Sequence, residues 1–150
     1  MPGVASLGAS QYYAHPRNRF WDIMDRVCGA GRSIPYQQRL LRLLDHHLAL
    51  WDVLHSCVRS GSLDAAIEHH TALPNDLAGL LSGLPSLRRI CCNGATASVA
   101  LKRHFGAQLA REYPQIEVLK LPSTSPANAS CSDARKLQQW SQALEAVSRA

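Results

Sequence analysis

Short apolar runs of strand length alternate along this sequence with longer stretches that repeat their apolar residues at helical spacing. The runs are Leu48–Leu54, Leu87–Cys92 and Ile116–Leu121. The order strand, helix, strand is typical of a parallel sheet covered by helices on both faces. The sequence therefore predicts a single α/β domain over residues 1–150 with three layers, α/β/α. Helices are expected at residues 20–27, 36–46, 76–84, 95–104 and 133–148.

Capping residues set the expected ends of these helices. Asn75 is expected to cap the helix that follows it, and Ser132 the last helix. Gly106 is expected to end the helix that begins near Ala95. One acid, Asp52, lies inside the first apolar run, where a carboxylate is costly to bury unless it is paired or functional. Two interpretations of this acid stay open, a structural group bonded to the next loop and a functional group.

The balance of charged residues favours some classes of protein over others. The 16 lysines and arginines exceed the 11 aspartates and glutamates, and the net charge of +5 suits a polyanionic partner such as nucleic acid. Hydrophobic residues make up 46% of the chain, which is enough for a packed core. There is no run of about 18 apolar residues and no recognisable secretory signal. We therefore expect a protein that neither crosses a membrane nor is secreted.

The cysteines and histidines do not have the spacing of metal ligands. The five cysteines are odd in number and contain no CxxC pair, which argues against a disulfide framework, a zinc site or an iron–sulfur cluster. The histidines are scattered or directly adjacent, and adjacent residues of a helix do not share a face. We therefore expect a cytoplasmic protein with reduced thiols, no metal and no cofactor.

Residues 11–21 combine aromatic, basic and amide side chains at a density that is unusual for either a core segment or a loop. The stretch reads Gln-Tyr-Tyr-Ala-His-Pro-Arg-Asn-Arg-Phe-Trp. Burial would leave many polar groups unpaired, at a cost of about 1–3 kcal/mol each. Aromatic faces that stack a flat ring, with cations nearby for phosphate, suit a nucleotide pocket. A surface loop with an aromatic plug is the alternative that the residues alone leave open.

Three polar loops follow the expected strands, at residues 56–62, 93–94 and 122–130. The carboxyl ends of parallel strands meet at one edge of a sheet, and ligands of such sheets bind at that edge. The sequence therefore predicts a functional pocket there.

Several segments of the chain resemble the uracil-DNA glycosylase superfamily. Its mismatch-specific uracil/thymine glycosylases carry a Gly-x-x-Pro-Gly loop, then an aromatic residue, then an Ala-His-Pro-x-Asn-Arg-Phe-Trp segment. Pro2-Gly3 and residues 13–21 match this pattern. The hypoxanthine-DNA (deoxyinosine) glycosylase branch is the most similar, because its Tyr-Tyr-Ala-His-Pro-Arg-Asn and Pro-Ser-Thr-Ser-Pro-Ala segments also recur here. Further matches lie at residues 50–54, 61–67 and 93–97, so the resemblance covers nearly the whole chain.

The resemblance implies a monofunctional DNA glycosylase of base excision repair, which flips a deaminated base out of the duplex and hydrolyses its N-glycosidic bond. Hypoxanthine is the base that it implies. Uracil or mixed specificity stays open, and so does a non-catalytic nucleic-acid-binding module that retains the pocket. The implied partner is DNA containing deaminated bases, bound by a monomer.

The resemblance also implies roles for individual residues. Hydrolysis through an oxocarbenium-like transition state needs a positioned water, and in this branch the asparagine of the His-Pro-Arg-Asn segment, here Asn18, holds it. Tyr13 is implied to stack the base, and Gly3 and Asn93 to line its pocket. Asp52 corresponds to the position at which uracil enzymes read the base with an asparagine. An ionised carboxylate only accepts hydrogen bonds, so it can accept the N1–H of hypoxanthine, a group that adenine lacks.

The resemblance assigns the DNA backbone mainly to two segments. The loop segment at residues 123–128 resembles the segment that pinches phosphates and enters the minor groove. Leu121 stands where uracil enzymes often carry a histidine, so we expect no histidine electrophile. Lys120 is a further candidate phosphate contact. The expected DNA-binding residues are His15, Arg17, Arg19, Ser123, Thr124, Ser125, Pro126 and Asn128.

The sheet of this superfamily is implied to be mostly parallel and four-stranded, with a central first strand that precedes the Pro-Gly loop. This sequence begins inside that loop, with Met1 immediately before Pro2. We therefore expect the central strand to be missing, with a loss of buried apolar surface that lowers the stability and the activity.

Overall fold

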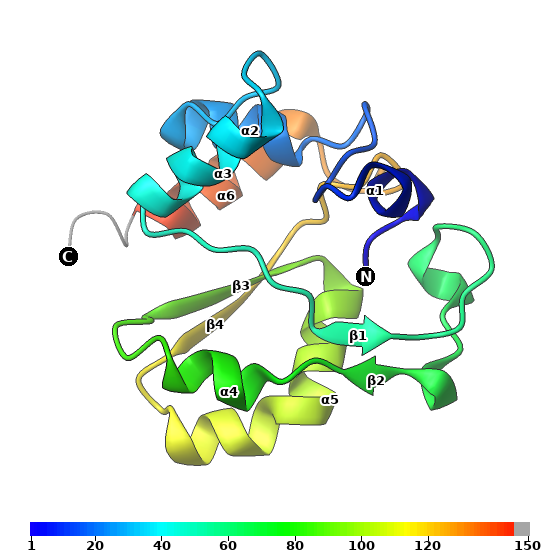
Figure 1. Ribbon diagram of the computed structural model, residues 1–150, viewed down its shortest axis with the longest axis vertical. Coiled ribbons are helices and arrows are strands. Elements are labelled where there is room, and N and C mark those ends of the chain that lie inside the picture. Colours follow the sequence, from blue (N-terminus) through cyan, green and yellow to red (C-terminus); the bar gives the residue numbers. More distant parts are fainter. Residues whose placement is uncertain (146–150) are drawn as a thin grey trace. The chain divides into compact units, whose positions relative to one another are not determined.

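The computed structural model of the chain describes residues 1–145 (Figure 1). The chain divides into two compact units. One, here called the sheet unit, consists of Met1 and residues 52–121, and the other, the helical unit, contains residues 2–51 and 122–145. The expectation of a single domain stays a prediction. No helix within residues 1–145 is long and apolar enough to cross a membrane.

The helical unit is built from α1 (Val4–Ala9), α2 (Phe20–Cys28), α3 (Tyr36–Asp45) and α6 (Asp133–Glu145). The last three begin where the sequence predicts, and the predicted continuation of α6 to residue 148 lies outside the described residues. Gly29 ends α2 with a φ of 69°, a left-handed conformation that glycine adopts without strain. The expected cap of α6 is confirmed, because Ser132 Oγ accepts a hydrogen bond from Arg135 N at 3.3 Å.

Aromatic rings hold the helices of this unit together. Phe20 of α2 and Trp140 of α6 meet edge to face, with ring centroids 6.0 Å apart, and both are buried. Trp21, with no exposed surface, packs edge-on against Tyr36 of α3 at 5.9 Å. The guanidinium of Arg39 lies 5.0 Å above the Trp21 ring. Burial of such rings contributes strongly to stability, so the start of α2 is firmly fixed within the unit.

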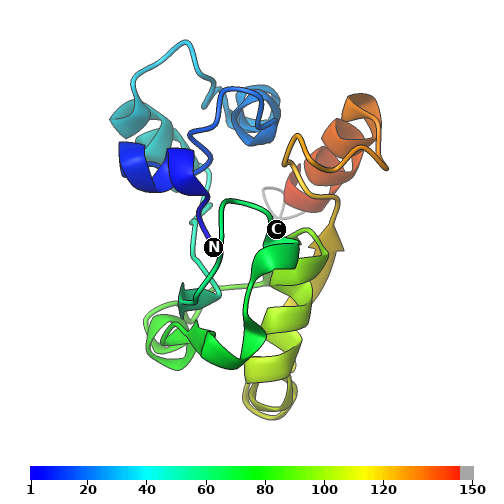
Figure 2. The same ribbon diagram turned by 90° about the vertical axis from the view of Figure 1, so that its right-hand side faces the viewer.

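The sheet unit contains a βαβ unit. β3 (Arg89–Asn93) runs parallel to β4 (Glu117–Leu121), from Arg89 opposite Glu117 to Asn93 opposite Leu121. α5 (Ala95–Glu112) connects the two strands and packs on both, and Figure 2 shows it alongside β4. This arrangement confirms the predicted α/β class. The buried cluster of this unit consists of Leu77, Leu81, Cys92, Leu101 and Leu109.

Two short antiparallel strands, β1 (Leu54–Ser56) and β2 (Leu73–Pro74), lie in the same unit. The 3₁₀ turns η1 (Asp64–Ala66) and η2 (His69–Thr71) separate them, and α4 (Leu77–Ser82) follows. Within residues 1–145 the strands therefore form two separate two-stranded sheets, one parallel and one antiparallel. This differs from the single four-stranded sheet that the resemblance implies.

The first apolar run does not form the predicted strand. Only Leu54 of this run belongs to β1, and Trp51 is half exposed. Backbone groups of the run pair with one asparagine: Asn75 Nδ2 donates to the carbonyl of Asp52 at 2.7 Å, and Asn75 N to the carbonyl of Val53 at 3.0 Å. The side chain and the backbone of Asn75 thus supply the partners of these two carbonyls, because backbone carbonyls need partners of some kind.

Two helix ends also differ from the prediction, each for a local reason. Asp76 caps α4 in place of Asn75, since Asp76 Oδ1 accepts from Gly79 N at 2.8 Å while Asn75 binds the Asp52 carbonyl. α5 continues through Gly106 to its end at Glu112. A glycine inside a helix costs about 1 kcal/mol, and burial of the apolar residues beyond it offsets that cost.

Cys92 is expected to make the sheet unit sensitive to alkali. Burial in β3 raises the pKa of its thiol from 9.0 to about 11. The unfolded chain loses this proton near pH 9 and the folded chain only near pH 11. The contribution of this thiol to the free energy of unfolding is therefore complete below pH 9 and is lost as the pH rises to 11.

Urea denaturation at a series of pH values tests this expectation. The Cys92→Ala variant should lose less stability between pH 9 and pH 11 than the wild type does. Cys131→Ala, which changes a thiol of the helical unit, should behave like the wild type. Equal losses in all three proteins would contradict the effect of burial.

Candidate active site

The segment between α1 and α2 lacks regular structure, so its backbone groups need other partners. Side chains of the helical unit supply them. Tyr12 N donates to the hydroxyl of Tyr36 at 3.0 Å, and Trp21 Nε1 donates to the carbonyl of Tyr12 at 2.9 Å. Ala14 N donates to Ser6 Oγ at 3.1 Å. These bonds tie the segment to α1, α2 and α3.

Arg32 binds three backbone carbonyls of this segment, residues 11–19, which we call the anchored loop. Its Nη2 lies 3.3 Å from the carbonyl oxygen of Tyr13, 2.9 Å from that of His15 and 3.0 Å from that of Asn18. Arg32 follows three residues after Gly29, the left-handed residue that ends α2. The sequence analysis did not identify this residue, and no motif or spacing around it signals the role.

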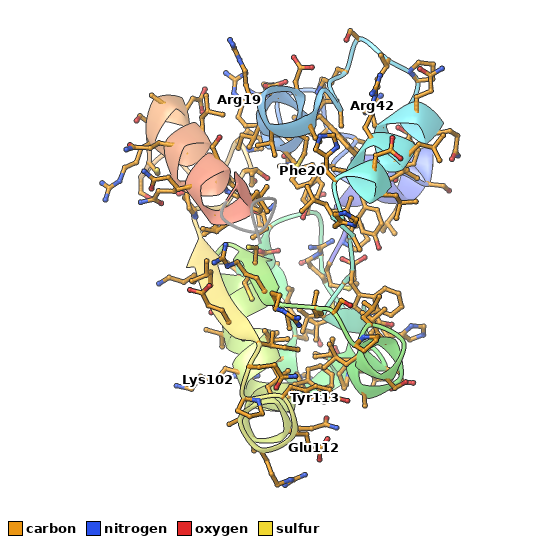
Figure 3. All side chains as sticks on the ribbon, turned by 90° about the vertical axis from the view of Figure 1, so that its left-hand side faces the viewer. Arg19, Phe20, Arg42, Lys102, Glu112 and Tyr113 are labelled. Atoms are coloured by element: carbon orange, nitrogen blue, oxygen red, sulfur yellow. The ribbon has the colours of Figure 1, made fainter. Side chains whose placement is uncertain are left out.

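The loop between β4 and α6, residues 122–130, is called here the distal loop, and it is bonded to the anchored loop. Arg19 N donates to the carbonyl of Thr124 at 3.0 Å, and the Thr124 side chain is fully buried. Trp140 Nε1 donates to the carbonyl of Pro122 at 3.0 Å. Figure 3 labels Arg19 and Phe20 at the start of α2. The structure thus brings together two polar segments from distant parts of the sequence.

Hydrogen bonds within the distal loop fix its conformation. Ser123 Oγ accepts from Ser125 N, and Ser125 Oγ accepts from Ala127 N, each at 3.2 Å. Asn128 Nδ2 donates to the carbonyl of Ser123 at 3.0 Å. Lys136 of α6 is buried and donates from Nζ to the carbonyl of Asn128 at 3.0 Å. The role of this lysine was missed as well, since a lysine on a helix face gives no signal of it.

The amide of Asn18 is held in one orientation. Its Oδ1 accepts a hydrogen bond from Phe20 N at 3.0 Å, and its backbone N–H donates to the carbonyl of His15 at 2.9 Å. Because Oδ1 accepts from a backbone N–H, the oxygen and the nitrogen of this amide are distinguished. An amide oxygen has two acceptor sites. Oδ1 can therefore accept a further hydrogen bond, for example from water.

His15 and Arg17 form a small electropositive group in the same loop. Arg17 N donates to His15 Nδ1 at 3.1 Å, so the neutral ring carries its hydrogen on Nε2 and presents a donor there. Arg17 is exposed, and among residues 1–145 its guanidinium has no ion-pair partner. A ring N–H and a guanidinium so close in sequence suit an anionic ligand.

The guanidinium of Arg19, by contrast, is held by two carboxylates. Its Nη1 lies 3.0 Å from Asp22 Oδ2, and its Nη2 lies 2.8 Å from Asp133 Oδ2. The hydrogen bond from Arg19 to Asp22 and the charge of Asp133 raise the pKa of Arg19. A phosphate at Arg19 would compete with both acids. The predicted phosphate contact of this residue therefore has an internal competitor that Arg17 lacks.

The ring of Tyr13 is fixed by stacking. It lies on the ring of Phe20 with centroids 4.0 Å apart and planes inclined by 23°. The backbone of Tyr13 has a φ of 52°, a left-handed conformation that few residues other than glycine adopt. Phe20 is itself part of the buried core. Tyr13 therefore presents a flat aromatic surface in a defined plane, as stacking of a base requires.

Three predicted site residues belong to the sheet unit. Asp52 precedes β1, and its Oδ1 lies 3.5 Å from the amino nitrogen of Met1. Asn93 is the last residue of β3, and the N–H of Gly94 beyond it donates to the carbonyl of Leu121 at 3.0 Å. Lys120 is exposed on β4. The roles assigned to these residues stay predictions.

Two further predicted residues lie in the helical unit. Gly3 is the residue before α1, and its carbonyl accepts from Ser6 N at 2.9 Å and from Leu7 N at 3.0 Å. Pro126 of the distal loop is exposed. Gly3 lies one helical turn before Ser6, whose Oγ accepts from Ala14 N of the anchored loop.

The fold is shared with a solved structure along almost the whole chain. The solution NMR structure of a protein from Methanosarcina acetivorans, described as a candidate uracil DNA glycosylase, matches with a TM-score of 0.76 and 30% identity. The match covers 97% of this chain and 85% of that one. The chain thus has the fold of the uracil-DNA glycosylase superfamily. Its βαβ unit and the polar loops before α2 and after β4 all lie within the matched length.

Curated relatives narrow this class to one branch. A hypoxanthine DNA glycosylase from Methanosarcina acetivorans is 34% identical over 143 residues, which cover 93% of this chain and 83% of the relative. One from Methanosarcina barkeri is 35% identical over 95 residues, or 63% of this chain and 59% of that relative. No protein-family model matches the chain. The chain belongs to the hypoxanthine DNA glycosylase family, as the sequence resemblance indicates.

Replacement of Trp21 tests the link between the core and the anchored loop. Trp21→Phe removes the donor to the Tyr12 carbonyl and leaves a small void, so we expect a loss of about 2–4 kcal/mol in the free energy of unfolding. Trp51→Phe, at a half-exposed tryptophan, should cost no more than about 0.5 kcal/mol. Urea denaturation measures both, and similar losses would show that Trp21 has no special role.

Proposed function

We propose that this chain excises hypoxanthine from DNA by hydrolysing the N-glycosidic bond of deoxyinosine, which leaves an abasic site. The class of reaction follows from membership of a DNA glycosylase family. Hypoxanthine is the base in the names of both curated relatives. The observation that carries the proposal is the fixed amide of Asn18, whose oxygen has an acceptor site for the attacking water.

In the proposed reaction the nucleotide is flipped out of the duplex so that water can reach the sugar. Phe20 N occupies one acceptor site of Asn18 Oδ1, and the second accepts a hydrogen from the water and orients its oxygen toward C1′. The water oxygen forms the new bond to C1′, while the bond from C1′ to the base breaks and its electron pair leaves with the base. An amide is a very weak base, so the proton of the water passes to the departing base or to solvent.

The proposed contacts to the DNA backbone come from the two loops. The Nε2–H of His15 and the guanidinium of Arg17 donate to phosphate oxygens, with Arg19 as a weaker candidate because of its two carboxylates. In the distal loop, Ser123, Ser125, Pro126 and Asn128 contact the sugar–phosphate backbone, and Thr124, which is buried, supports the loop from within.

Base recognition is proposed to combine stacking with hydrogen bonds. Tyr13 stacks the flipped base, supported by the Phe20 ring beneath it. Asp52 accepts the N1–H of hypoxanthine, while Asn93 and Gly3 line the pocket. The support for these last three roles is the family resemblance and the acceptor chemistry of a carboxylate.

Uracil is a second candidate base, because the structural relative is described as a candidate uracil DNA glycosylase. Release of each base from duplexes that contain deoxyinosine or deoxyuridine separates the two candidates. Binding of either duplex by the folded chain without release of a base would instead support a non-catalytic nucleic-acid-binding module.

Replacement of Asn18 is the first test of the mechanism. Asn18→Ala removes the water-orienting acceptor, and we expect the single-turnover rate of hypoxanthine release to fall by about 100-fold or more. Asn18→Asp retains an acceptor for both the water and Phe20 N, so it should lose much less activity. A wild-type rate for Asn18→Ala would contradict the assignment.

The side-chain cap of α4 provides the control for this experiment. Asn18→Ala also removes the bond to Phe20 N at the start of α2, and loss of a side-chain bond to a backbone N–H costs about 1 kcal/mol. Asp76→Ala removes the corresponding bond to Gly79 N at the start of α4. This variant should lose similar stability and keep the wild-type rate of base release, since Asp76 has no part in the proposed chemistry.

The choice of base is expected to depend on Asp52. Asp52→Asn replaces a charged acceptor with an amide, and a hydrogen bond to a charged group is worth about 1.5–3 kcal/mol. The ratio of hypoxanthine to uracil release should therefore fall by at least about tenfold. Asp45→Asn, at an exposed acid that ends α3, is the matched control. An unchanged ratio in Asp52→Asn would argue that this residue does not read the base.

A further inference from the structure

We propose that Arg32 is a positioning residue for the glycosylase reaction, one that holds the catalytic asparagine in place through the backbone of the anchored loop. The inference rests on the proposed function of Asn18 and adds a residue that the resemblance does not assign. Its basis is the convergence of three carbonyl oxygens of the loop on one guanidinium nitrogen.

The geometry of this contact is that of a clamp. The two hydrogens of Nη2 serve three acceptors, so at least one hydrogen is shared, and the contact to the Tyr13 carbonyl is the longest at 3.3 Å. The carbonyls of Tyr13, His15 and Asn18 can point at one atom only if the loop curls around it. Removal of Arg32 would leave these oxygens close together without the shared Nη2 donor, and the His15 carbonyl would keep only its bond from the N–H of Asn18. Such a cluster of acceptors favours a different loop conformation.

The clamped residues are the ones to which the proposed function gives chemical roles. Tyr13 stacks the base, His15 donates to phosphate, and Asn18 orients the water. The backbone of Tyr13 is left-handed, a conformation that persists only where its surroundings impose it. Displacement of a reacting group by about 1 Å can cost about 100-fold in rate. A residue that sets the loop conformation therefore sets the rate, although it need not touch the substrate.

The surroundings of Arg32 favour this role over direct contact with DNA. Its Nε is buried and, within residues 1–145, has no hydrogen-bond partner. Asp22 Oδ1 lies 3.9 Å from that atom. A carboxylate beside the guanidinium repels a phosphate, whereas carbonyl oxygens accept from it without bringing a second negative charge. Arg17 and Arg19 of the loop are both exposed, and Arg19 is paired with two acids, whereas Arg32 donates to the loop backbone.

Two substitutions and one control test the inference. Arg32→Ala removes the clamp. Arg32→Lys keeps the charge but ends one bond short of Nη2 and lacks the planar fork. Arg26→Ala, at an exposed arginine of α2 with no ion pair among the described residues, is the matched control. The measurements are the single-turnover rate of hypoxanthine release at saturating protein, and the dissociation constant of an uncleavable deoxyinosine duplex at several salt concentrations.

We expect the single-turnover rate to fall by about 100-fold in Arg32→Ala and by a smaller factor in Arg32→Lys, with no change in Arg26→Ala. The salt dependence of DNA binding should stay as in the wild type. Loss of a phosphate contact would instead reduce the slope of log K against log salt by about 1. A reduced slope with an unchanged rate at saturation would overturn the inference and make Arg32 a DNA contact.

Added guanidinium ion separates positioning from a general loss of stability. If Arg32→Ala stays folded and only the clamp is missing, guanidinium at concentrations far below those that denature should restore part of the rate. The same addition should have no effect on Asn18→Ala, in which the clamp is intact. Absence of any rescue in a folded Arg32→Ala protein would count against the clamp.

Amide hydrogen exchange makes the test independent of activity. In Arg32→Lys the N–H of Asn18 and the N–H of Arg19 should exchange faster than in the wild type, while amides of α5 keep their rates. Unchanged exchange in the anchored loop would overturn the inference even in an active enzyme. A folded wild type that releases no base would overturn the proposed function, and faster loop exchange in the variant would still support the clamp.

Discussion

The need of backbone groups for hydrogen-bond partners is the constraint on which the candidate site depends. The anchored loop forms no helix or strand, and each unpaired group that it buried would cost about 1–3 kcal/mol. Side chains of the surrounding helices meet this need, and one of them, Trp21, is also the most completely buried aromatic of the core. The same residues therefore build the core and shape the loop. The aromatic packing beneath the loop therefore also fixes the position of Asn18. Its amide is preorganised in this way before any DNA is bound.

The basic residues in and beside the two loops divide into two groups with different contacts. Arg32 and Lys136 donate to backbone carbonyls, and Arg19 pairs with two acids. The charged groups of these three residues are therefore engaged in contacts within the protein. Arg17 is exposed and has no such partner within residues 1–145. The net charge of +5, which belongs to the whole chain, therefore does not tell how many cations the two loops can offer to phosphates. On the proposed assignments, the two loops bind DNA through a few donors of defined geometry more than through bulk charge.

The sequence predicted those parts of the fold and of the site that are encoded locally. The periodicity of α2, α3 and α6 and the order β3, α5, β4 follow from patterns within single segments. The strand predicted at residues 48–54 was wrong. The carbonyls of Asp52 and Val53 bind the side chain and the backbone of Asn75, and a distant asparagine leaves no trace in the pattern of the run. Arg32 was missed for the same reason, since one arginine without a motif cannot be linked to carbonyls in another segment. Tyr13, His15 and Asn18, by contrast, stand together in one recognisable stretch.

The proposed assignments also bear on how one acid can select a base during the reaction. The amide of Asn18 is a poor proton acceptor and activates the water only weakly. On the proposed mechanism the rate therefore depends mainly on how well the departing base is stabilised. A purine protonated at N7 leaves as a neutral molecule, and a carboxylate that accepts its N1–H stabilises the positive charge on the ring before departure. Uracil leaves as an anion, which the same carboxylate would repel. On this assignment Asp52 favours hypoxanthine in the transition state as well as in binding, and interactions that are stronger in the transition state are the ones that raise the rate.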